Sequence, residues 1–127
     1  MTPEQLDALK QAIRAGNDVD TAAHFAGVSV ANVYRWLEAG KLEAERIAYG
    51  EAPNPDLADY LTFWEELRKS RAEAIVRNVA HIQKAAQNGA WQAAAWWLER
   101  TVPETYARSK GVKNEVEGQQ PKQVTGA

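Results

Sequence analysis

Residues 21–37, TAAHFAGVSVANVYRWL, decide the fold of this chain. They predict two short helices joined by a tight turn. The small residues Ala22 and Ala23 allow another helix to cross closely over the first of these helices. Gly27 then supplies the left-handed backbone that a helix-ending turn requires. Ser29 can cap the next helix, because its hydroxyl can accept a backbone N–H bond from the first turn.

The second helix of this pair has one apolar and one polar face. Val33, Trp36 and Leu37 recur at helical spacing and are expected to face the core. A helix-turn-helix of this kind places its second helix in the major groove of DNA, where arginine pairs with guanine and asparagine with adenine. We therefore predict a DNA-reading face made of Ser29, Val30, Ala31, Asn32, Tyr34 and Arg35. The alternative is a small helical hairpin that only packs.

The composition limits the class of protein. A chain of 127 residues, 45% of them apolar, can form one ordinary domain or two small ones. The absence of cysteine excludes a disulfide scaffold and a cysteine-based zinc finger, and it fits a reducing cytoplasm. No apolar run is long enough to span a membrane, and the polar start MTPEQLDALK does not resemble a signal peptide.

The charge balance argues against strong DNA binding by one copy. The formal net charge is -2, and residues 1–50 hold five Lys/Arg against seven Asp/Glu. Residues 51–107 hold six against eight, and residues 108–127 hold four against two. Because phosphate contacts supply most non-specific affinity, a single domain is expected to bind DNA weakly. Several linked copies would raise the affinity.

The first domain is predicted to occupy residues 1–50. Thr2 caps a first helix, which carries an apolar stripe behind the predicted helix-turn-helix. Asp20 is the expected cap of the second helix. The third helix is expected to end near residues 39–40, with residues 41–49 as a separate helical piece. Gly, Pro and Asn at residues 50–55 then mark the domain boundary.

Residues 51–107 predict a helical hairpin that associates with other copies. Asp56 is the expected cap of a long helix that ends near residues 88–89, and an alanine-rich helix follows at residues 90–100. Apolar residues at 3–4 spacing form a heptad-like seam on the long helix. The predicted oligomer interface consists of Leu61, Trp64, Ile75, Val79, Ile82, Trp91, Trp96 and Trp97. Residues 108–127 lack a core and are expected to form a flexible tail.

No pattern for an enzyme is present in the sequence. A phosphate-binding glycine loop with lysine is absent, and His24 and His81 are too scattered for a metal site. Acidic pairs such as Glu43/Glu45 are expected to be solvated or ion-paired. The sequence therefore predicts no catalytic residues, no metal and no cofactor.

Two stretches resemble the small subunit of phage terminases. One is AAHFAGVSVANVYRWLEAG, and the other is GAWQAAAWWLERTVPETYARSKG. The second is the more specific, and its matching positions are Gly89, Trp91, residues 93–95, Leu98, Glu99, Arg100, Pro103, Glu104, Tyr106 and Arg108. The order of the two parts agrees as well.

The resemblance implies a non-enzymatic subunit of a genome-packaging motor in the host cytoplasm. Such proteins form homo-oligomeric rings, bind the packaging start site on double-stranded viral DNA, and recruit the large ATPase-nuclease subunit. Residues after Pro103 would then meet the large subunit. The acidic first domain departs from this pattern. The alternatives are a transcriptional regulator with a dimerising hairpin and an oligomeric structural adaptor that does not bind DNA.

Overall fold

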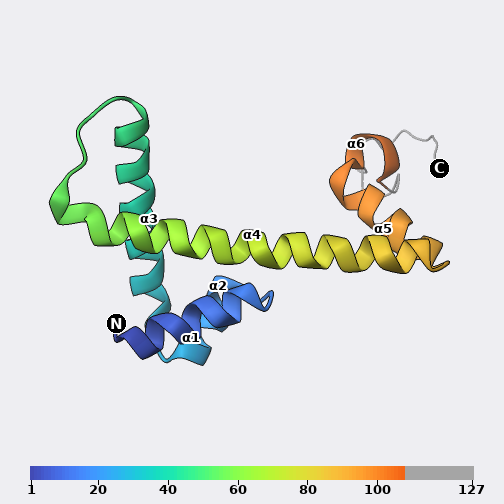
Figure 1. Ribbon diagram of the computed structural model, residues 1–127, viewed down its shortest axis with the longest axis horizontal. Coiled ribbons are helices and arrows are strands. Elements are labelled where there is room, and N and C mark those ends of the chain that lie inside the picture. Colours follow the sequence, from blue (N-terminus) through green and yellow to red (C-terminus); the bar gives the residue numbers. More distant parts are fainter. Residues whose placement is uncertain (108–127) are drawn as a thin grey trace, which may run out of the picture. The chain divides into compact units, whose positions relative to one another are not determined.

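A computed structural model describes residues 1–107, and every regular element in this range is a helix (Figure 1). The all-α class predicted from the sequence is therefore confirmed for these residues. The predicted flexible tail, residues 108–127, lies outside them. The elements are α1 (Pro3–Arg14), α2 (Val19–Ala26), α3 (Val30–Ala48), the 3-10 helix η1 (Pro55–Leu57), α4 (Ala58–Gln87), α5 (Trp91–Thr101) and α6 (Pro103–Tyr106).

The chain divides into two compact units, the first ending at Arg77 and the second beginning at Asn78. Residues 49–54 are free of helix, as the glycine and prolines there predict. The first unit nevertheless continues past the boundary predicted at residue 50. It does so because Phe63 and Leu67 of α4 belong to the same buried cluster as residues of α1, α2 and α3.

The helix starts follow capping chemistry, with two differences from the prediction. The Thr2 hydroxyl accepts the Gln5 backbone N–H at 3.0 Å, so the first cap is confirmed. Asp18, and not Asp20, caps α2, because the helix already begins at Val19. Asp56, the expected cap of the long helix, lies inside η1, and η1 itself is capped by Asn54. In both cases the cap lies just outside the helix, where the backbone is extended.

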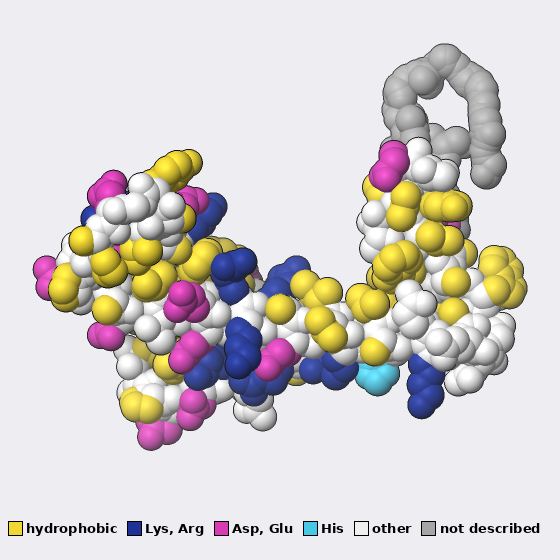
Figure 2. All heavy atoms as spheres, turned by 45° about the horizontal axis from the view of Figure 1, so that its top comes forward, with side chains coloured by type: hydrophobic (Ala, Val, Ile, Leu, Met, Phe, Trp, Pro, Cys, Tyr) yellow, Lys and Arg dark blue, Asp and Glu magenta, His cyan; other side chains and the backbone are white. Residues whose placement is uncertain are grey.

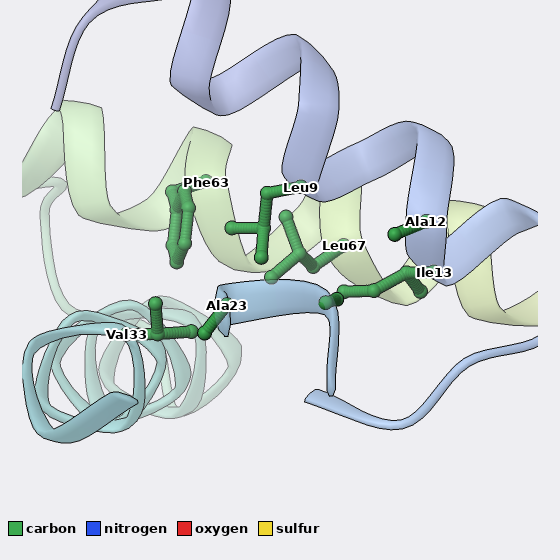
Figure 3. Close-up of a cluster of buried hydrophobic side chains, with 8 residues drawn as sticks. Leu9, Ala12, Ile13, Ala23, Val33, Phe63 and Leu67 are labelled. Atoms are coloured by element: carbon green, nitrogen blue, oxygen red, sulfur yellow. The ribbon is translucent and has the colours of Figure 1, made fainter. Parts of the chain in front are cut away.

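The core of the first unit is formed by apolar side chains from four helices. Figure 3 shows Leu9 of α1 beside Phe63 and Leu67 of α4, with Val33 and Ala23 opposite them. Leu9, Ala23 and Val33 are completely buried. Full burial of a leucine or valine side chain contributes about 1.5–3 kcal/mol. The buried members are Leu9, Ala12, Ile13, Ala22, Ala23, Val33, Phe63 and Leu67.

Helix α3 runs unbroken from Val30 to Ala48, so the predicted end near residues 39–40 is wrong. The glycine at position 40 lies inside the helix and is buried. A Cβ at this position would lie 2.2 Å from the Tyr60 carbonyl oxygen and 2.5 Å from Trp64 Cβ. Gly40 therefore allows the backbones of α3 and α4 to approach closely, and does not end the helix.

Glu43 ties the helix-free segment to α3. Its carboxylate is buried, accepts the Asn54 backbone N–H at 2.6 Å, and pairs with Arg46. The hydrogen bond from Asn54, and then the bond from Arg46, lower the pKa of Glu43 below its ordinary value. Of the two expected states, solvated or ion-paired, the structure confirms the ion pair for Glu43, whose carboxylate is buried.

Candidate functional site

The connection between α2 and α3 has the local geometry that the sequence predicts. Gly27 adopts the left-handed conformation at φ 73° and ψ 33°. The Val28 backbone N–H then bonds the Ala23 carbonyl at 3.0 Å, which closes the end of α2. The Ser29 hydroxyl accepts the Asn32 backbone N–H at 3.2 Å and caps α3. Three residues thus separate the two helices.

Small and apolar residues fix how these helices pack. Ala22 and Val33 are fully buried. Trp36 is half-buried and meets the ring of Phe63 edge to face, with centroids 5.8 Å apart. These contacts hold α3 so that the opposite side of its first two turns is open to solvent.

The six residues of the predicted reading face lie on that first part of α3 and its cap. Ser29, Ala31, Tyr34 and Arg35 are exposed, whereas Val30 and Asn32 are half-buried. The structure brings two of them together, because the Arg35 guanidinium donates a hydrogen bond to the Asn32 side-chain oxygen. Arginine and asparagine are the side chains that best read guanine and adenine edges, so this pair is the most specific feature of the face.

Carboxylates border the predicted reading face. The Tyr34 hydroxyl donates to Asp20 at 2.8 Å, and Asp18 lies two residues away at the start of α2. The hydrogen bond to Asp20, together with the negative charge of both carboxylates, raises the pKa of Tyr34. This negative border would repel phosphates, which lowers the contribution expected from Tyr34 in the predicted reading face.

Basic side chains gather on α4, a feature that the sequence reasoning missed. Residues 68–77 hold Arg68, Lys69, Arg71 and Arg77 against one carboxylate, and Figure 2 shows Lys and Arg side chains crowded over the middle of this helix. One member of this group, Arg77, contacts α1, and so does the neighbouring carboxylate of Glu73. Arg14 pairs with Glu73 at 3.0 Å, and Arg77 donates to the Arg14 carbonyl at 2.5 Å. A count of charge within each helix would have found this cluster.

The predicted interface residues differ in exposure within the first unit. Leu61 and Trp64 are half-buried, and the guanidinium of Arg68 lies 4.4 Å from the centre of the Trp64 ring. Ile75 is 51% exposed, and its neighbour Val76, which was not predicted, is 69% exposed. An isoleucine and a valine so exposed on one helix are a candidate association surface.

The second unit exposes aromatic rings. Trp91 is 69% exposed and Trp96 is 46% exposed, with Arg100 stacked 4.2 Å from the Trp96 ring centre. Trp97 is half-buried, and its buried indole N–H has no acceptor among residues 1–107. Val79 and Ile82, which also belong to the predicted interface, are half-buried.

Residues 1–107 contain no group of three or more His, Cys, Asp or Glu side chains placed to hold a metal ion. No helix in this range has the length and apolar character needed to cross a membrane.

Comparison with known proteins does not extend these observations. No protein family, no curated protein and no solved structure matches this chain.

Proposed function

We propose that this protein is an oligomeric DNA-recognition subunit of the phage terminase small-subunit kind. In that role it would bind the packaging start site on viral DNA and recruit the large subunit. The observation that carries the proposal is the start of α3, where a left-handed Gly27 and a Ser29 cap present the Asn32–Arg35 pair to solvent. The resemblance of the two sequence stretches adds the packaging role.

The exposed aromatic rings support self-association. A tryptophan that is 69% exposed on a helix is typical of an interface core, where aromatic residues are enriched. Association is also needed on electrostatic grounds. The first unit holds nine Lys/Arg against thirteen Asp/Glu, so one copy gains little from phosphates. Several copies on one duplex would gain by multivalency.

Mass measurement tests the assembly. We expect native mass spectrometry to find a closed homo-oligomer larger than a dimer. Trp91→Glu should lower the mass of the assembly, because it places a charge in the proposed interface. Gln92→Glu is the control, since it adds the same charge at the adjacent exposed position, and it should leave the mass of the assembly unchanged. A wild-type dimer would favour the transcriptional regulator. A monomer would remove the argument drawn from the tryptophans.

DNA titration tests the reading face. Anisotropy of a labelled 30-base-pair duplex should show that Arg35→Ala weakens binding by about tenfold or more, as loss of a bidentate base contact would. Arg14→Ala removes the same charge from a residue already paired with Glu73, and it should stay close to wild type. Unchanged binding in Arg35→Ala would move the DNA contact away from α3. Absence of binding by the wild type would favour the structural adaptor.

A further inference from the structure

The first unit contains a groove whose lining includes Tyr34 of the predicted reading face and Trp64 and Ile75 of the predicted interface. It has a volume of about 440 Å³ and is lined by residues of α1, α2, α3, α4 and the segment between α1 and α2. Leu37, Leu67 and Ile75 are among the apolar side chains that line it. The volume lies within the range of ordinary binding pockets.

Basic side chains outnumber acidic ones around this groove, whereas the reverse holds for the first unit as a whole. Lys41, Arg68 and Arg71 reach it, against the single carboxylate of Glu38. The unit as a whole is acidic, so the positive charge is concentrated here. Stacking on Trp64 holds the Arg68 guanidinium in place, and neither Lys41 nor Arg71 forms an ion pair within residues 1–107.

The apolar lining and the neighbouring cations indicate which kind of molecule can bind in the groove. A duplex presents phosphates and would leave Leu37 and Ile75 in contact with water or sugar. A helix with an apolar stripe and flanking carboxylates would bury these side chains and neutralise the cations. The chain's own last twenty residues do not fit, because they carry four Lys/Arg against two Asp/Glu.

A second copy fits less well than an acidic partner. The exposed aromatic helix α5 carries Arg100, stacked on the Trp96 ring, next to its single carboxylate, Glu99, so this helix offers no net negative charge to the groove. Like charges facing each other across an interface lower affinity. Charge complementarity therefore favours a different protein.

We propose that this groove binds a short amphipathic helix of a partner protein whose apolar face is flanked by carboxylates. Lys41, Arg68 and Arg71 pair with these carboxylates, and Leu37, Leu67 and Ile75 receive the apolar side chains. This proposal does not depend on DNA binding by α3.

Peptide titration tests the groove on the full chain. The probe is a fluorescein-labelled helical peptide with leucines at i, i+3, i+4 and i+7 spacing and glutamates elsewhere. The matched peptide carries lysines in place of the glutamates. We expect micromolar binding of the acidic peptide only. Arg71→Glu should weaken it by about tenfold or more, since the reversal places a carboxylate beside those of the peptide.

Two further variants separate the contributions. Ile75→Gln should weaken the acidic peptide through lost apolar burial, and because Ile75 is 51% exposed the unit should keep its helical circular dichroism. Lys69→Glu makes the same charge change as Arg71→Glu on the same helix, but Lys69 does not line the groove. It should weaken the peptide by much less.

Four results would overturn the proposal. The first is that the wild type does not bind the acidic peptide, and the second is that it binds the lysine peptide equally well. The third is that Lys69→Glu weakens the acidic peptide as much as Arg71→Glu does. The fourth is that a DNA duplex displaces the acidic peptide and that binding of this duplex requires Arg71. A fifth result, in which Arg71→Glu and Ile75→Gln lower the mass of the protein's own assembly and leave peptide binding unchanged, would assign the groove to a second copy.

Discussion

Gly40→Ala tests the closest helix crossing in the first unit. The change adds one methyl group in the middle of α3, at a buried position. That methyl carbon would lie 2.2 Å from the Tyr60 carbonyl oxygen and 2.5 Å from Trp64 Cβ. Neither atom is the far end of a flexible side chain, so α4 or α3 must move as a whole.

The two effects of this substitution oppose each other. Alanine is better than glycine inside a helix by about 1 kcal/mol. Overpacking a tight contact costs about 1–3 kcal/mol, and a backbone oxygen in the contact favours the upper part of that range. We therefore expect Gly40→Ala to lower the free energy of unfolding by about 1–2 kcal/mol. For a unit of this size the melting temperature should fall by roughly 5–15 °C.

Urea unfolding followed by circular dichroism measures this difference, with wild type and variant at one protein concentration. Glu45→Gly provides the control for helix propensity, because Glu45 is exposed in the same helix. It should cost less than about 1 kcal/mol. If Gly40→Ala is instead as stable as wild type, or gains the propensity difference, the close approach of α3 and α4 is wrong.

Three more outcomes follow from contacts already described. Leu9→Ala should lower the free energy of unfolding by about 2–5 kcal/mol, as deletion of a fully buried leucine does, and a wild-type urea midpoint would contradict the core in Figure 3. Ser29→Ala should cost about 1 kcal/mol in the same assay through loss of the α3 cap, and no loss would mean that the cap contributes nothing. Because the pKa of Glu43 is lowered in the folded chain, its contribution is complete above its ordinary value of 4.5 and is lost as the pH falls through the lower folded value. Glu43→Gln should therefore melt earlier than wild type at pH 7 and show a smaller fall in melting temperature below pH 4.5, and parallel pH profiles of the two proteins would count against the Asn54 contact.

The features predicted correctly from the sequence are local ones. The Thr2 cap, the left-handed Gly27 and the Ser29 cap each depend on a few neighbouring residues, and all three are present in the structure. The helical spacing of Val33 likewise places it in the core. These signals require no knowledge of distant parts of the chain.

The features that were missed depend on residues distant in the sequence or on the choice between neighbouring polar residues. An isolated glycine usually weakens or ends a helix, and only the close passage of α4 explains why a glycine stands at position 40 inside α3. Burial of Glu43 depends on Asn54, eleven residues away, so helical periodicity alone could not reveal it. Asp18 and Asp20 are equally good caps by residue type, and the start of α2 at Val19 decides between them. The DNA-reading face and the oligomer interface remain predictions.

The place of Phe63 and Leu67 in the core sets where the chain can be cut. A fragment that stops at the proline-rich segment would keep α1, α2 and α3 but lose both side chains, and Leu9 would then be exposed to water. Such a fragment should be poorly soluble and partly unfolded, although the sequence marks that segment as the natural place to truncate. The shortest N-terminal piece expected to give a dispersed NMR spectrum extends to Arg77.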